Sequence, residues 1–277
     1  MRRLTLLLIA VLPLSAGTLA HAQATQWTTG PCPTGQNATH NGGLWHWNGS
    51  RVCELRRATL ANTGSLKMEA DNGSITVIGE DRKDIAIEAR ITVDSTNQKD
   101  AAALLRQITI DTNGTIRAHG PHFSGWWSHG GYSVDYNLRV PETIAAKAET
   151  ANGNVTLRTL HGTLRAESTN GTVTLSDLAG DVHASTVNGG ISIRLEGDHW
   201  DGAGLTGETV NGGISVSMPT GYSARLRAST VNGGISVDFP VTVEGKITHD
   251  LDANIGRGGA PIQMHTVNGG VQFKRRD

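Results

Sequence analysis

The sequence predicts an all-β fold, a β-solenoid with coils of about 20 residues. The first of two observations is a repeated phrase, clearest in Thr186-Val-Asn-Gly-Gly-Ile-Ser-Ile193. Beyond residue 60, every Asn-Gly pair has Ile or Val three positions after the asparagine, followed by a polar residue. Apolar–polar–apolar alternation after a glycine turn is typical of a half-buried strand. The asparagines of these phrases are Asn72, Asn113, Asn152, Asn170, Asn188, Asn211, Asn232 and Asn268.

The second observation is the spacing of these asparagines, which lie 41, 39, 18, 18, 23, 21 and 36 residues apart. In a solenoid each coil returns to the same place, so near-equal spacing is required and like side chains stack in a column. The alternative is an antiparallel β-hairpin meander, because Asn-Gly also favours two-residue hairpin turns. The regular central spacing favours the solenoid. The expected corner column contains Asn152, Asn170, Asn188, Asn211, Asn232 and Asn268.

Residues 1–22 are typical of a secretory signal peptide. Arg2 and Arg3 precede an apolar run, Leu6–Leu14, and Ala20-His21-Ala22 matches an Ala-x-Ala cleavage signal. Losing these 22 of 277 residues would change the formal net charge from −1 to −3, because two arginines are removed. That charge does not indicate nucleic-acid binding, and no later apolar run is long enough for a membrane span. We expect an exported protein, either periplasmic or at the cell surface.

Residues 23–59 are predicted to form an N-terminal cap or arm, and residues 60–277 the β-strand-repeat domain. Cys32 and Cys53 are the only cysteines, and in an exported chain they are expected to pair. That disulfide would contribute about 3 kcal/mol; a reactive or metal-binding pair is the alternative. Trp27, Trp45 and Trp47 would cover the end of the core, or would contact a sugar.

One short helix is expected within Asn97–Gln107. Residues 101–105 read Ala-Ala-Ala-Leu-Leu, which are good helix formers, and Ser95 or Asn97 could cap the start.

Residues 119–132 are predicted to form an irregular loop that is rich in glycine, histidine and tryptophan. Three histidines could bind a metal, but the loop contains neither Cys nor acid, and the spacing fits no zinc pattern. We therefore predict no metal site and no cofactor. The tryptophans could fold back onto the core, or the loop could contact a glycan or peptide. The candidate ligand-contact residues are His119, His122, Trp126, Trp127 and His129.

Two outer rows follow from the repeat. One is expected to carry Thr156, Thr174, Ser192, Ser215 and Ser236, and a neighbouring row Glu149, Glu167 and Glu208. Hydroxyl rows suit a solvated strand surface and also suit a flat ligand. The charged tail, Lys274–Asp277, is expected to end the apolar surface.

Serial Thr-x-Asn-Gly-x-Ile/Val phrases follow Tyr136-Asn-Leu-Arg-Val-Pro141 and alternate with Leu-x-Gly-x-Leu/Val corners at Leu160–Leu164 and Leu178–Val182. With these features, residues 60–273 resemble the bacterial putative-adhesin family of exported β-strand-repeat proteins, a domain of unknown function. The family commonly has Ser-Gly-Asp where this chain has Asn-Gly-Gly. The resemblance implies a right-handed β-helix-like solenoid, association with the envelope or surface, and no catalytic residue.

We therefore expect a non-catalytic binding or adhesion scaffold whose partner is an envelope component, glycan or protein. A polysaccharide-active β-helix enzyme is one alternative, and an accessory protein of envelope stress signalling is another. Enzymatic function is disfavoured because no Gly-x-Ser-x-Gly, His-Glu-x-x-His or phosphate-loop motif occurs. The acids that could act in polysaccharide cleavage occupy different phases of the repeat; these are Asp71, Asp181, Asp198, Asp201 and Asp238.

Overall fold

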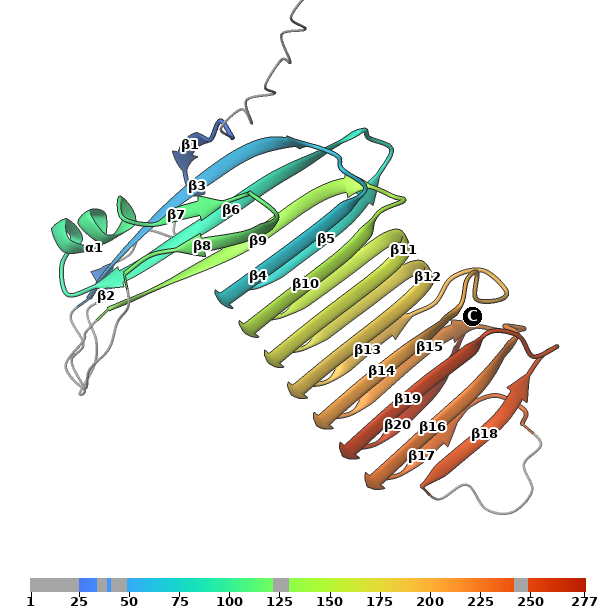
Figure 1. The fold of residues 1–277 in the computed structure, drawn as a ribbon. Helices are drawn as coiled ribbons and strands as arrows, with labels where there is room; N and C mark the ends of the chain where they lie inside the picture. Colours follow the sequence, from blue (N-terminus) through green and yellow to red (C-terminus); the bar gives the residue numbers. More distant parts are fainter. Residues whose placement is uncertain (1–24, 34–38, 41–48, 122–129, 242–248) are drawn as a thin grey trace, which may run out of the picture.

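The computed structural model describes residues 25–33, 39–40, 49–121, 130–241 and 249–277 (Figure 1). Figure 1 shows a rack of short strands stacked side by side, with longer strands at its N-terminal end. Strands that carry the repeated phrase pair in parallel with the equivalent strands of neighbouring coils. The predicted β-solenoid is therefore confirmed, and the hairpin meander does not describe the repeats.

The N-terminal end consists of long antiparallel strands that continue the solenoid. β3 pairs with β6, and β6 pairs with β9, which then pairs in parallel with the first coil. The expected domain boundary at residue 59 falls inside β3. The strands here are β1 (Thr28–Pro31), β2 (Thr39–His40), β3 (Gly49–Ala61), β6 (Asp84–Ser95), β7 (Thr109–Asp111), β8 (Thr115–His119) and β9 (Gly131–Pro141).

Two local predictions for this end are confirmed. Cys32 and Cys53 form a disulfide with a Cα–Cα distance of 5.8 Å, which links the residues after β1 to β3. A helix, α1 (Gln98–Leu105), begins where the backbone N–H of Asp100 donates to Oδ1 of Asn97 at 2.9 Å. Trp27 packs partly buried against the core. Trp45 and Trp47 lie outside the described residues, as does the expected signal peptide.

Each solenoid coil is a strand, an Asn-Gly turn and a second strand. We call the strands that lead into these turns the entry sheet, and those that leave them the exit sheet. Long strands β11 and β12 leave one turn, bend at the second corner near Gly162 and Gly180, and enter the next turn. The entry sheet contains β4 (Ser65–Asn72), β10 (Ala145–Asn152), the later parts of β11 (Val155–Asn170) and β12 (Val173–Asn188), β14 (Gly204–Asn211), β16 (Ala224–Asn232) and β19 (Pro261–Asn268). β18 (Asp250–Ile255) leads into no turn asparagine but joins this sheet at the edge of β16. The exit sheet contains β5 (Ile75–Glu80), the first parts of β11 and β12, β13 (Ile191–Arg194), β15 (Ile214–Pro219), β17 (Ile235–Val237) and β20 (Val271–Arg276).

The core lies between the two sheets and is built from columns of like side chains. The apolar residue three positions after each turn asparagine stacks on its equivalents in neighbouring coils. Ile235, in the coil at the end of the stack, is only partly buried. The other six are at most 2% exposed, and each contributes roughly 1.5–3 kcal/mol by burial. These residues are Ile75, Val155, Val173, Ile191, Ile214 and Val271.

The final coil does not lie at the end of the stack. β19 pairs with β14 on one side and with β16 on the other, so the last coil is inserted between two earlier ones. β20 lies between β15 and β17 in the same way. Antiparallel β18 covers the other edge of β16. The expected charged tail, Lys274–Asp277, is mostly strand, because Lys274–Arg276 belong to β20 and pair with Ser217–Pro219 of β15.

One of the eight phrases is not a coil. β8 follows Asn113 but pairs with the entry strand β4, with Ile116 opposite Met68. Asn113 instead hydrogen-bonds through its backbone N–H and its Nδ2 to Oδ1 of Asp111. The apolar–polar alternation of the residues after Asn113 suits any half-buried strand. The sequence pattern alone therefore could not show that this phrase is not a coil.

Candidate functional site

The turn asparagines form a continuous ladder of side-chain hydrogen bonds. Each Nδ2 donates to the Oδ1 of the next asparagine at 2.9–3.0 Å, as in the bond from Asn170 to Asn152. The structure brings together all six expected corner residues and adds Asn72. Because the last coil is inserted, the spatial order differs from the sequence order. In space it is Asn72, Asn152, Asn170, Asn188, Asn211, Asn268 and Asn232.

In six of the seven turns, a buried hydroxyl residue two positions before the asparagine fixes the turn from inside, whereas Ala70 takes this place before Asn72. Thr209, which is 3% exposed, donates from Oγ1 to the carbonyl oxygen of Gly189 in the neighbouring coil at 2.8 Å. The glycine after each asparagine is required by the close approach of the coils. A Cβ on Gly171 would overlap the carbonyl oxygen of Gly153. Equivalent hydroxyl bonds are made by Thr150, Ser168, Thr186, Thr230 and Thr266.

The two outer rows expected from the repeat lie on opposite faces. Residues three before the turn belong to the entry sheet and residues four after it to the exit sheet, so the acidic row does not neighbour the hydroxyl row. On the exit sheet Gln272 also separates Ser215 from Ser236, because the last coil is inserted. The expected acidic residues lie in one row of the entry sheet, which also contains other polar residues. In spatial order this row is Glu69, Glu149, Glu167, Ser185, Glu208, His265, Ser229 and Asp250.

Glu167 in this row lies beside the carboxylate of Glu149. Burial, a hydrogen bond with Glu149 and the negative charge of Glu149 raise the pKa of the Glu167 carboxyl. Glu149 is also paired with Lys147 at 2.7 Å, from a parallel row of basic side chains. The two rows of opposite charge therefore partly offset the repulsion within each row.

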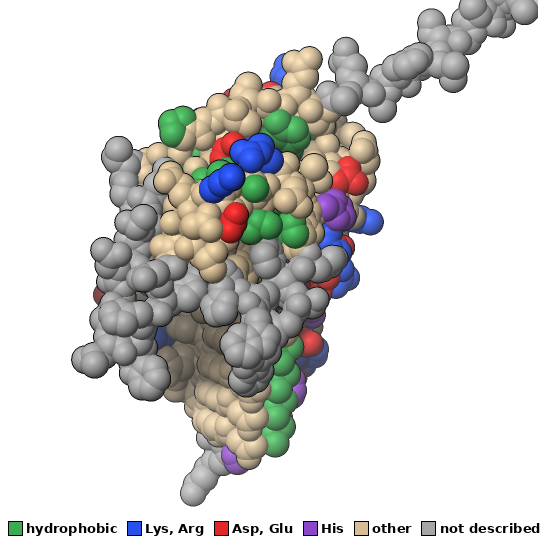
Figure 2. Space-filling view, turned by 90° about the vertical axis from the view of Figure 1, so that its left-hand side faces the viewer, with side chains coloured by type: hydrophobic (Ala, Val, Ile, Leu, Met, Phe, Trp, Pro, Cys, Tyr) green, Lys and Arg blue, Asp and Glu red, His purple; other side chains and the backbone are tan. Residues whose placement is uncertain are grey.

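A stripe of exposed valines borders the asparagine ladder on the entry-sheet side. Val187, Val210 and Val231 are 42%, 41% and 58% exposed, and half-buried Val267 completes the row. Figure 2 shows this stripe as a hydrophobic band beside the turn edge of the rack. It places an apolar surface directly next to the polar rows of the entry sheet.

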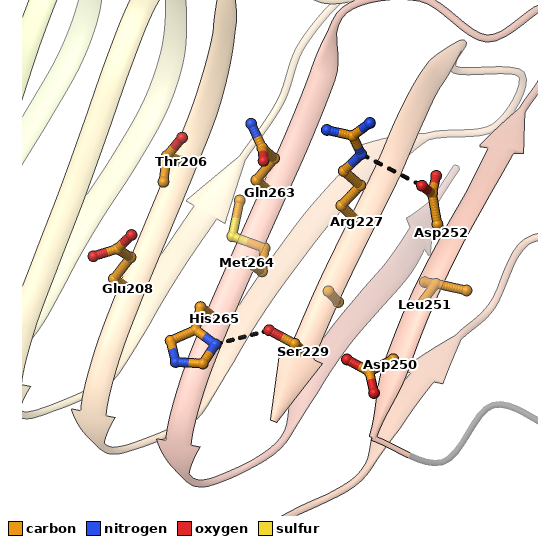
Figure 3. Close-up of a pocket in the computed structure, with 11 residues that line it drawn as sticks. Thr206, Glu208, Arg227, Ser229, Asp250, Leu251, Asp252, Gln263, Met264 and His265 are labelled. Atoms are coloured by element: carbon orange, nitrogen blue, oxygen red, sulfur yellow. Dashed lines mark hydrogen bonds and ion pairs between the residues drawn. The ribbon is translucent and has the colours of Figure 1, made fainter. Parts of the chain in front are cut away.

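A groove of about 430 Å³ crosses the entry sheet over β14, β19, β16 and β18 (Figure 3). Its polar side chains form two rows because the four strands are in register. Arg227 lies 3.5 Å from Asp252, and this carboxylate also accepts two hydrogen bonds from Arg225 at 2.8 and 2.9 Å. One row contains Glu208, His265, Ser229 and Asp250, and the other Thr206, Gln263, Arg227 and Asp252.

Glu208, His265 and Ser229 have the residue types of a nucleophilic triad. Ser229 Oγ lies 2.7 Å from Nδ1 of His265, and Figure 3 shows the ring directed towards the serine. Acyl transfer also needs free backbone N–H groups that stabilise an oxyanion. In this row the strand backbones run in parallel ladders on both sides of β19, which engage those donors. In the described part of this row the backbone donors are therefore engaged within the sheet, and the side chains offer hydrogen-bonding groups to a ligand.

A second polar cluster secures the inserted coil. Arg276, on β20, donates to both carboxylate oxygens of Glu196 at 3.0 and 2.8 Å and to the carbonyl oxygen of Leu195 at 2.9 Å. Arg194 adds a third hydrogen bond to that carboxylate at 2.9 Å. These guanidinium groups lower the pKa of Glu196 to about 2.

The expected ligand-contact loop is largely outside the described residues. His119 is exposed at the end of β8, whereas His122, Trp126, Trp127 and His129 lie in the undescribed segment 122–129. Across the described ranges, no group of three or more His, Cys, Asp or Glu side chains could hold a metal ion. No helix in the same ranges is long and apolar enough to cross a membrane.

Sequence reasoning missed the groove itself. His265 and Ser229 are 36 residues apart and belong to phrases that look like successive coils, with β18 between them in the sequence. Successive coils would also place Ser229 beside His265, but only the inserted position of β19 brings His265 next to Glu208 and separates Glu208 from Ser229. A signal was present in the 36-residue gap between Asn232 and Asn268, which leaves room for an extra strand.

The chain is similar to a known protein family and to several solved structures. A family model described as Toastrack DUF4097 matches residues 131–274. A "putative cell adhesion protein" from Clostridium sporogenes is 12% identical with a TM-score of 0.43, over 80% of this chain and 99% of that one. A "putative adhesin" from Bacteroides fragilis is 11% identical with a TM-score of 0.39, over 80% and 97%. A comparison with curated proteins gives no match.

Proposed function

The chain belongs to the Toastrack DUF4097 family, and from this premise we propose that it is an exported, non-catalytic scaffold that binds a component of the cell envelope. Export is supported by the signal-like residues 1–22 and by the disulfide between Cys32 and Cys53, since disulfides persist in oxidising compartments. The compartment would be the periplasm or the cell surface. The groove across β14, β19, β16 and β18 is the contact surface.

One observation carries this proposal: the groove presents eight polar side chains in two rows on four paired strands. Three of the four strands, β14, β19 and β16, are paired on both sides, so they lose little conformational freedom when a ligand binds and this part of the groove is preorganised. Adjacent strands are roughly 4.8 Å apart, so a ligand lying across them meets new hydrogen-bonding groups at that interval. An extended partner uses such a surface better than a small compact one.

The chemistry of the groove suits a hydroxyl-rich glycan. Carboxylates accept hydrogen bonds from hydroxyl groups, whereas Gln263 and Ser229 both donate and accept. The exposed valine stripe next to the groove would contact the apolar faces of sugar rings. Acids and bases of opposite charge are both present, so recognition would depend on hydrogen bonds more than on net charge.

A matched pair of variants on one coil tests the proposal. Gln263 lies in the groove on β19, and Gln272 lies on the opposite face on β20. The mature protein, Gln263→Arg and Gln272→Arg would each be passed over immobilised envelope polysaccharide and, separately, over immobilised envelope protein. We expect the polysaccharide column to retain the mature protein and the Gln272→Arg variant. The Gln263→Arg variant should bind the polysaccharide at least about tenfold more weakly. Equal binding by both variants would contradict use of the groove.

Turnover is the outcome that distinguishes the enzymatic alternative. The same polysaccharide, incubated with the mature protein, should keep its chain length. Shortening that disappears in a Glu208→Gln variant would replace the binding proposal with a polysaccharide-active enzyme. Retention on the protein column alone would instead favour a protein partner, as an accessory role in stress signalling requires.

A further inference from the structure

Two kinds of hydrogen bond restrain the turns inside the asparagine ladder. An interior asparagine such as Asn211 donates from Nδ2 to Asn188 and accepts at Oδ1 from Asn268. The glycine that follows it, Gly212, donates its backbone N–H to the carbonyl oxygen of Asn268 at 3.0 Å. Both the carboxamide and the next backbone nitrogen are therefore held in place.

The two ends of the ladder differ. At the N-terminal end, the N–H of Gly73 donates to the carbonyl oxygen of Asn152 at 2.9 Å, so that turn is still held. At the other end, Asn232 donates from Nδ2 to Asn268 at 2.9 Å and is exposed. Within the described ranges, no residue donates to Oδ1 of Asn232 and none accepts from the N–H of Gly233. Among the residues that the structure describes, nothing thus supplies either restraint on the outer side of the last turn.

Asparagine followed by glycine is chemically labile when this geometry is free to change. The backbone nitrogen of the glycine attacks Cγ of the asparagine, a C–N bond forms, and the bond from Cγ to Nδ2 breaks. The proton of the glycine nitrogen leaves with Nδ2 as ammonia. Water then opens the cyclic imide at either carbonyl, which gives aspartate or isoaspartate. Glycine favours the first step because it has no side chain to hinder the attack, and asparagine is among the thermolabile residues.

We propose that Asn232 is a site of spontaneous deamidation, and that the ladder protects the chemically equivalent asparagines inside the stack. The new carboxylate would face Oδ1 of Asn268 without a proton to donate, and isoaspartate would also lengthen the turn backbone by one atom. Both changes loosen the terminal coil. They also add a negative charge three residues from Ser229, at the rim of the groove.

The sequence supplies an internal control for this proposal. Four asparagines sit in the same pentapeptide, Thr-Val-Asn-Gly-Gly, so their intrinsic reactivity is matched and only their place in the ladder differs. Three are interior and one is terminal. They are Asn188, Asn211, Asn268 and Asn232.

The test follows deamidation of the full mature protein at mildly alkaline pH and 37 °C by peptide mass spectrometry. The two hydrogen bonds that must break at an interior turn should slow its reaction at least about tenfold relative to Asn232. A parallel sample in denaturant should bring all four rates together. Equal rates in the folded protein, or an interior site that reacts before Asn232, would overturn the proposal.

Discussion

Replacing Thr209 by valine tests the hydroxyl column that fixes the turns. Valine has almost the same shape, so no cavity forms, but the donor to the carbonyl oxygen of Gly189 is lost. The site is 3% exposed, so water cannot readily replace the bond. An orphaned buried acceptor costs about 1–3 kcal/mol, and each kcal/mol lowers the Tm of a domain of this size by about 2–4 °C.

The matched control is Thr206→Val, on the outer face of the same strand and half-buried. It makes the same chemical change without removing a bond to the turn. Thermal and urea unfolding, followed by far-ultraviolet circular dichroism, would measure both variants. If Thr209→Val is as stable as Thr206→Val, the buried hydroxyl groups do not stabilise the turns through their bonds to the glycine carbonyl oxygens.

Two further predictions concern charges whose pKa is shifted. Glu167→Gln should raise Tm at neutral pH by the equivalent of a few tenths to about 1 kcal/mol, because the carboxylate beside Glu149 is disfavoured in the folded state; the gain should fade as pH falls and the carboxyl protonates, and Glu208→Gln is the control in the same row. Glu196→Gln should lower Tm at neutral pH by less than about 1 kcal/mol, since the ion pair with Arg276 is partly exposed. Because the folded pKa is depressed, that difference should persist above pH about 4.5 and disappear as pH falls to about 2; a difference that grows on acidification would contradict the assignment.

The local part of the fold could be predicted because the coils repeat it. Asn152 and its equivalents carry the turn, the glycine after each permits close approach, and the alternating residues give the two faces. Asn97 likewise marks the start of α1 by ordinary capping chemistry. These features depend on residues a few positions apart, which is the range over which sequence patterns are informative.

The order of the coils could not be predicted. The phrases at Asn211, Asn232 and Asn268 share one pentapeptide, so each of these coils offers the same turn and the same backbone pairing edge to its neighbours. Their arrangement depends on the connection through β18, which pairs antiparallel to β16 and returns the chain to the gap. The groove depends on that order, so its residues were also inaccessible to local reasoning.

Cross-linking measures the central claim, that like asparagines stack and that the last coil lies between its two predecessors. Neighbouring strands are roughly 4.8 Å apart and strands two apart are about twice that, whereas a disulfide needs Cα atoms within about 7 Å. Three double variants would be oxidised and mapped: Asn211→Cys with Asn268→Cys, Asn268→Cys with Asn232→Cys, and Asn211→Cys with Asn232→Cys. The first two pairs should link. The third should not, although Asn211 and Asn232 are closer in sequence than the members of either other pair. Linkage of Asn211→Cys to Asn232→Cys, without linkage to Asn268→Cys, would show that the coils simply follow the chain.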